Sequence, residues 1–131
     1  MILEQNTYVA RAEKAINECR KVTNSRGKVE MITTSQIRNL LAMTADIYNQ
    51  VMLSMSDVLS EDIMGRISYL KIRFIYEIGR DGKMKTFAQQ AEILKAIDEI
   101  GNSKKKFILF NRYMEALVAY HRFYGGKEFP Y

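Results

Sequence analysis

The chain has 131 residues and a formal net charge of +5, and its composition is 47% hydrophobic and 27% charged. These values exclude a disordered or fibrous chain, and the length predicts one domain over residues 1–131 with a short disordered tail from about residue 127. No apolar run approaches the ~20 residues that span a membrane, and the N-terminus carries Glu4 and no apolar signal core, so we expect a cytoplasmic protein without a membrane partner. Cys19 is the only cysteine, which excludes an internal disulfide and favours a reducing compartment.

Apolar residues at helical spacing predict two helices in the first half of the chain. The first begins after Thr7, a residue type suited to N-capping. Its inward face is expected to hold Val9, Ala12, Ile16 and Cys19. A turn over 24–27 ends this helix. The second helix begins at Thr33, and Gln36 three residues later completes the pattern of a capping box.

Three further helices are predicted in the second half. The third starts after Ser60, and its inner stripe is Ile63, Ile67, Leu70, Phe74 and Ile78. Gly65 weakens this helix, and the sequence leaves open whether it is merely tolerated or permits close approach of a neighbouring backbone. The fourth helix runs over about 84–100, and the fifth from Ser103 to Gly125. Short connections predict antiparallel packing, so the expected fold class is all-α, a compact bundle of about five helices.

The last predicted helix is apolar on more than one side, and it also carries a family resemblance. Residues 112–126 read Arg-Tyr-Met-Glu-Ala-Leu-Val-Ala-Tyr-x-x-Phe-Tyr-Gly-Gly. This pattern resembles the C-terminal signature of the small helical subunit of type III-A CRISPR effector (Csm) complexes. Residues 33–38 and 69–80 are similar to the same family. Taken along the chain, the resemblance runs in order from about Tyr8 to Lys127.

This resemblance implies a non-catalytic RNA-binding subunit of an RNA-guided effector complex that acts in antiviral defence. Its implied partners are guide RNA, target RNA, other subunits of the complex and other copies of itself, which stack along the RNA. Cleavage of target RNA and DNA is expected to come from neighbouring subunits. The resemblance thus implies that this chain stabilises a ribonucleoprotein and cuts nothing.

Residues suited to catalysis are scarce. His121 is the only histidine, and its place on the apolar face of the last helix predicts a core or interface residue with one hydrogen bond. Cys19 falls on the apolar side of the first helix, where a buried inert thiol is expected. One histidine and one cysteine do not supply the ligands of a metal site. We therefore predict no enzyme activity, no catalytic residue, no metal and no cofactor.

Binding is better supported by the third predicted helix. Arg66, Arg73 and Arg80 are spaced by seven residues, which places them on one line of a helix at about 100° per residue. Tyr69 and Tyr76 lie beside that line, and we call these five residues the arginine ridge. Arginine pairs with phosphate, and tyrosine stacks on splayed bases. The ridge together with the basic net charge favours an RNA backbone as partner.

An equally weighted alternative is that the same face is ordinary charged surface, with Asp62 and Glu77 neutralising part of the ridge. Residues of the resembling motifs extend the candidate set beyond the ridge. The predicted RNA-binding residues are Arg38, Arg66, Lys71, Arg73, Arg80 and Arg112. Lys71 points away from the ridge, so it is expected to serve a different strand or a protein partner.

Two other functions stay open at this point. Residues 33–51 could be the recognition helix of a DNA-binding helix-turn-helix regulator, although Arg38 is the only cation in it. A protein-only structural adaptor is the second alternative. It is favoured by several methionines and by Ile72, Ile75 and Ile108, which lie off the predicted inner faces and provide apolar surface for partner subunits.

Overall fold

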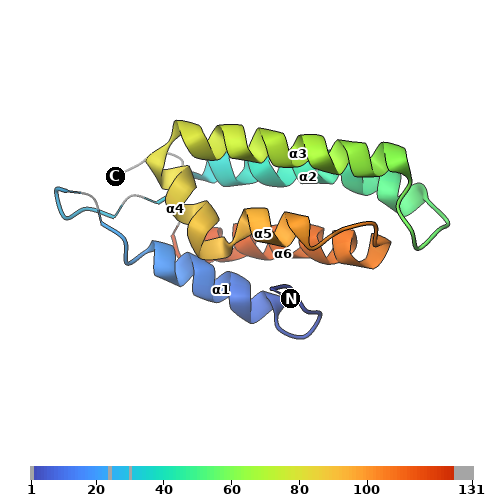
Figure 1. Cartoon of the computed structure of the whole chain (residues 1–131). Coiled ribbons are helices and arrows are strands. Elements are labelled where there is room, and N and C mark those ends of the chain that lie inside the picture. The colour runs from blue at the N-terminus through green and yellow to red at the C-terminus, as the bar shows by residue number, and fades with distance from the viewer. Residues whose placement is uncertain (1, 24, 30, 126–131) are drawn as a thin grey trace.

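The computed structural model describes residues 2–23, 25–29 and 31–125, which fold into six helices (Figure 1). These are α1 (Tyr8–Cys19), α2 (Thr34–Leu53), α3 (Glu61–Arg80), α4 (Gly82–Ala91), α5 (Ile93–Asp98) and α6 (Lys104–Phe123). Extended pairing in the described ranges is limited to two isolated bridges, Thr23 with Val29 and Val58 with Ser103. The predicted all-α class is confirmed. The tail expected from about residue 127 lies outside the described residues.

Helix α6 lies at the centre of the bundle. It packs against α2 on one side and α1 on another, while α3 packs on α2, α4 and α5 (Figure 1). Its fully buried side chains are Phe107, Phe110, Tyr113, Met114 and Leu117. A helix that is buried on several sides must be apolar around most of its circumference, which explains its composition. None of the helices described is long and apolar enough to cross a membrane.

Side-chain caps begin three of the four helices for which the sequence predicts a capping residue. The Thr33 hydroxyl accepts a hydrogen bond from the Gln36 backbone amide, and the Gln36 side chain accepts one from the Thr33 amide, so the capping box is confirmed. Ser60 and Ser103 likewise accept hydrogen bonds from the first turns of α3 and α6. Thr7 precedes α1 as predicted, but its side chain makes no capping hydrogen bond.

The single helix expected over 84–100 is instead two helices, α4 and α5, separated at Glu92. Glu92 adopts the left-handed conformation, with φ 53° and ψ 43°. The break frees the Ala91 carbonyl, and the buried Tyr113 hydroxyl donates a hydrogen bond to it at 2.8 Å. Arg11 holds the Glu92 carboxylate from α1 at 3.1 Å. Contacts from distant residues therefore stabilise a break that local sequence does not predict.

One residue of the expected inward face of α1 is also placed differently. Ala12, Ile16 and Cys19 are buried as predicted, but Val9 is 45% exposed. Tyr8 packs against the core instead. The inward stripe therefore begins at Tyr8 and continues through Ala12, a full turn later, which leaves Val9 on the outer side.

Candidate nucleic-acid interface

The arginine ridge is exposed along the outer face of α3. Tyr69 and Tyr76 are 61% and 64% exposed, and Arg66, Arg73 and Arg80 are exposed as well. An adjacent stripe of the helix is buried through Ile63, Ile67, Leu70 and Phe74. Burial of this stripe orients α3, so the ridge lies exposed beside the buried stripe.

The charges of the ridge are only partly neutralised. Arg80 forms an ion pair with Glu77 at 3.2 Å, and its guanidinium lies 5.4 Å from the centre of the Tyr76 ring. Arg66 and Arg73 make no hydrogen bond or ion pair with any residue that the structure describes. Two of the three ridge cations, Arg66 and Arg73, are therefore available to an external anion.

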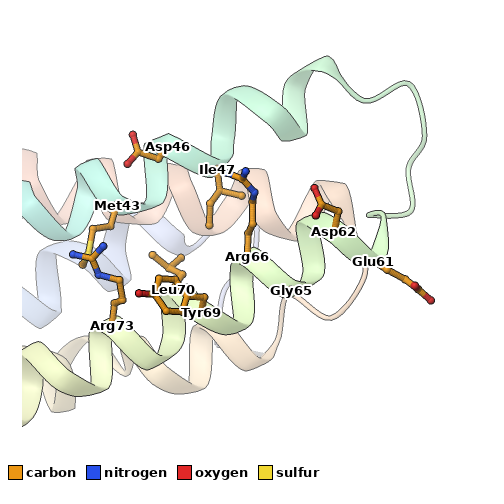
Figure 2. A pocket seen from close by; sticks show the side chains of 10 residues that line it. All are labelled: Met43, Asp46, Ile47, Glu61, Asp62, Gly65, Arg66, Tyr69, Leu70 and Arg73. Atoms are coloured by element: carbon orange, nitrogen blue, oxygen red, sulfur yellow. The ribbon is translucent and has the colours of Figure 1, made fainter.

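A groove of about 490 Å³ runs between α2 and α3 beside these two arginines (Figure 2). Its lining is Met43, Asp46, Ile47, Glu61, Asp62, Gly65, Arg66, Tyr69, Leu70 and Arg73. Figure 2 shows Arg66 and Arg73 reaching from α3 toward α2. We call this hollow the α2–α3 groove. The sequence did not predict the contribution of α2, because nothing local indicates which helix lies beside the ridge.

Arg38 is exposed near the start of α2 and lines a second hollow, of about 460 Å³, at the end of α6. Arg122 lines the same hollow from α6, so two cations separated by 84 positions meet there. Sequence reasoning did not include Arg122 among the site residues, although it lies on the polar side of the last helix.

Lys71 and Arg112 differ in their surroundings. The Lys71 ammonium forms an ion pair with Asp98 of α5 at 2.6 Å, so it links two helices in addition to any contact with RNA. Arg112 is exposed on α6 and makes no ion pair with a described residue. The structure does not gather the six predicted residues into one patch: Arg66 and Arg73 share the α2–α3 groove, and Arg38 lies in a different hollow.

A third hollow, of about 760 Å³, combines basic and aromatic side chains that sequence reasoning did not connect. It is lined by Asn17, Arg20, Lys21, Lys28, Val29, Met31, Tyr124 and Gly125. The Arg20 guanidinium lies 4.8 Å from the centre of the Tyr124 ring. The Tyr124 hydroxyl donates a hydrogen bond to Glu13 at 2.5 Å. These contacts hold the end of α6 against α1.

The two side chains most suited to covalent or acid–base chemistry are buried in structural roles. Burial and, to a smaller extent, the nearby Glu18 charge together raise the pKa of Cys19 to about 12, so the thiol stays protonated. Burial lowers the pKa of His121, whose Nε2 lies 2.6 Å from the Ile32 carbonyl and donates to it. Over the described ranges, no three histidine, cysteine or acidic side chains gather as metal ligands would.

Comparison with known proteins identifies the family. Residues 10–127 match the family described as Csm2 Type III-A. The chain belongs to this family. It is 40% identical to the "CRISPR system Cms protein Csm2" of Streptococcus thermophilus, over 97% of this chain and 98% of that protein. The protein of the same name from Mycobacterium tuberculosis H37Rv is 34% identical, over 98% of this chain and 99% of the relative.

A third relative of that name, from Enterococcus italicus, is 38% identical over 86% of both chains. The resemblance found in residues 112–126 and the two upstream stretches is therefore confirmed over nearly the whole chain. Membership makes this chain a small subunit of a type III-A CRISPR complex, whose other subunits are its partners.

Proposed function

We propose that this protein is a non-catalytic small subunit that binds the sugar–phosphate backbone of guide RNA and target RNA and stabilises the complex in antiviral defence. The observation that carries the proposal is that Arg66 and Arg73, exposed on α3, have no ion-pair partner among the described residues. The other proposed RNA-binding residues are Arg38, Lys71, Arg80 and Arg112. Several copies stack along the RNA in the cytoplasm, in contact with the other subunits.

The spacing of the ridge suits a nucleic-acid strand. Arg66 and Arg73 are seven residues apart, which is about 10.5 Å along an α-helix. At this separation two adjacent ridge arginines can contact two different phosphates of one strand. Contacts of this kind position a strand without reading its bases. They suit a complex in which base pairing with the guide selects the target.

The test replaces Arg66 and Arg73 together by alanine and measures the affinity for single-stranded RNA over a range of salt concentrations. Each lost phosphate contact is expected to reduce the slope of log affinity against log salt by about 0.7. Affinity should fall equally for RNAs of different sequence. Lys14→Ala is the control, because Lys14 is an exposed cation on α1 without an ion pair among the described residues. Unchanged affinity and slope in the double variant would contradict the proposal.

Lys71 needs a separate comparison because it already has a protein partner. Lys71→Met removes both the ion pair with Asp98 and a possible phosphate contact, whereas Asp98→Asn removes the ion pair alone. If Lys71 contacts RNA, only Lys71→Met weakens RNA binding. Equal binding by the two variants would leave Lys71 a purely structural residue.

A protein-only adaptor is the second candidate, and exposed apolar side chains favour it. Leu53, Met55, Ile72 and Ile75 are all exposed. Unaltered RNA affinity after loss of both ridge arginines, combined with lost assembly after mutation of these apolar residues, would support the adaptor. The regulator alternative is disfavoured, because 14 residues (20–33) separate α1 from α2, whereas a helix-turn-helix joins its helices by a turn of about 3–4 residues.

A further inference from the structure

The α2–α3 groove combines an apolar floor with unpaired polar groups on both walls. The floor holds Ile47 and Leu70, which are buried, and Met43, which is half-buried. Arg66 and Arg73 line the wall formed by α3, and Asp46 lines the wall formed by α2. None of these three charged side chains has a hydrogen bond or ion pair with a described residue. The groove therefore offers donors from α3 and acceptors from both helices, because Glu61 and Asp62 of α3 line it as well.

Gly65 keeps this groove open. It lines the groove one helical turn before Tyr69, and a Cβ built on it would meet no heavy atom within 4 Å outside its own helical surroundings. Close approach of a neighbouring backbone is thus not the reason for glycine here. Glycine weakens a helix relative to alanine, and no packing contact compensates for that loss. The space that a side chain would occupy is instead left free inside the groove.

The lining discriminates between possible occupants. A phosphate inside the groove would meet the negative charges of Asp46, Glu61 and Asp62, which line it, so a phosphate is expected only outside the groove, on the exposed ends of Arg66 and Arg73. An aliphatic side chain would cover the floor and leave the charged groups on both walls unpaired. A nucleobase has an apolar face and an edge with both donors and acceptors, and it stacks on tyrosine or on an arginine plane. The groove volume of about 490 Å³ lies within the range of small-molecule sites.

We propose that the α2–α3 groove accepts one unpaired nucleobase of the bound RNA, stacked on Tyr69, while Arg66 and Arg73 hold the flanking phosphates. This inference rests on the proposed function, since it adds a base pocket to the backbone contacts. The occupant comes from a single strand, because a base within a duplex does not expose its faces. Base identity is read weakly here, since stacking tolerates every base.

The test compares a short single-stranded RNA with the same RNA carrying abasic riboses, which keep every phosphate. Binding to the full chain is measured at low salt by fluorescence anisotropy. Removal of the bases should weaken binding to the wild type roughly 5- to 100-fold, the effect of losing base–aromatic stacking. Gly65→Leu fills the groove, so it should bind the intact RNA as weakly as the abasic RNA and leave abasic binding unchanged.

Two tyrosines of nearly equal exposure give a matched comparison. Tyr69→Ala removes the stacking partner inside the groove, and Tyr69→Phe retains it. Tyr76→Ala removes a ring of the same ridge that does not line the groove. Tyr69→Ala should bind intact and abasic RNA with equal affinity. Tyr69→Phe and Tyr76→Ala should still bind the intact RNA more tightly than the abasic RNA. Because Tyr69 is on the surface, this comparison is decisive even if Gly65→Leu fails to fold.

Each outcome separates the base pocket from the backbone contacts. Equally tight binding of intact and abasic RNA by the wild type would overturn the base pocket and leave the ridge proposal standing. Absence of binding to either RNA at low salt would overturn both. If Gly65→Leu and Tyr69→Ala prefer intact over abasic RNA as strongly as the wild type does but fail to assemble with other subunits, the groove is a protein-docking site and the inference is wrong.

Discussion

Gln36 joins the beginning of α2 to the junction of α3 and α4 through one side-chain amide. Its Nε2 donates a hydrogen bond to Asp81 at 2.9 Å, while its Oε1 accepts one from the Thr33 backbone at 2.9 Å. Asp81 in turn accepts a hydrogen bond from the Lys83 amide at 2.8 Å and so begins α4. Burial raises the pKa of Asp81, but these hydrogen bonds and the Lys83 charge lower it more. The net pKa is therefore below the ordinary value of an aspartate, and the carboxylate stays ionised to a lower pH.

Gln36→Glu tests this junction. Glutamate still accepts from the Thr33 amide, but it cannot donate to Asp81, and it places a second carboxylate beside it. We expect the free energy of unfolding at neutral pH to fall by about 1–3 kcal/mol, measured by urea denaturation. Part of the loss should disappear in acid, where the carboxylates become protonated. Gln90→Glu on the exposed side of α4 makes the same charge change without this contact, and equal losses in both variants would contradict the role of Gln36.

The left-handed conformation of Glu92 predicts a reversal of ordinary helix preferences. Both Glu92→Ala and Glu92→Gly lose the ion pair with Arg11, but only glycine adopts a φ of 53° without strain. The glycine variant should therefore be more stable than the alanine variant by about 1 kcal/mol. At Lys85, in the middle of α4, alanine should be better than glycine by a similar amount. The same order at both positions would show that residue 92 does not need the left-handed conformation.

The buried His121 predicts a loss of stability in mild acid. Burial and the Arg122 charge lower its pKa and outweigh the opposite effect of the hydrogen bond to Ile32, so the folded state binds a proton less readily than the unfolded state. The stabilisation is complete above the unfolded pKa of about 6.5 and is lost as pH falls through the lowered folded value.

His121→Gln keeps a donor for the Ile32 carbonyl but does not titrate. Urea midpoints measured from about pH 7.5 to 5 should therefore fall more steeply for the wild type than for this variant. His121 is the only histidine in the chain, so the difference isolates this ring. Parallel curves for the two proteins would mean that His121 does not couple protonation to folding.

The last residue of α2 and the connection that follows it expose apolar side chains that the fold does not need. Leu53 and Met55 are 82% and 99% exposed. Replacing both by serine should change the free energy of unfolding by less than about 0.5 kcal/mol but reduce co-purification with the other subunits of the complex. Val9→Ser, an exposed apolar position on α1, is the control. Full assembly of the double variant would show that partners do not cover this connection.

Features that depend on neighbouring residues could be predicted from the sequence. Thr33 and Gln36 form a capping box because they are three residues apart, and Arg66, Arg73 and Arg80 align because the helical repeat places every seventh residue on one line. The buried stripe of α3 and the glycine after α6, with φ 83° at Gly125, follow in the same way.

Relationships between segments distant in the chain could not be predicted. The break at Glu92 depends on Arg11 and Tyr113, which reach it from other helices. The partner of Lys71 lies in α5, and the floor and far wall of the α2–α3 groove come from α2.

The sequence by itself determined most of the helices, most of their ends and the line of cations on α3, because hydrogen bonding and side-chain direction within a helix repeat locally. Only the tertiary structure decided which of those cations stay unpaired and which helix faces them. Ion pairing and burial of a side chain depend on which segments lie side by side in the fold, and packing of the whole core determines that arrangement.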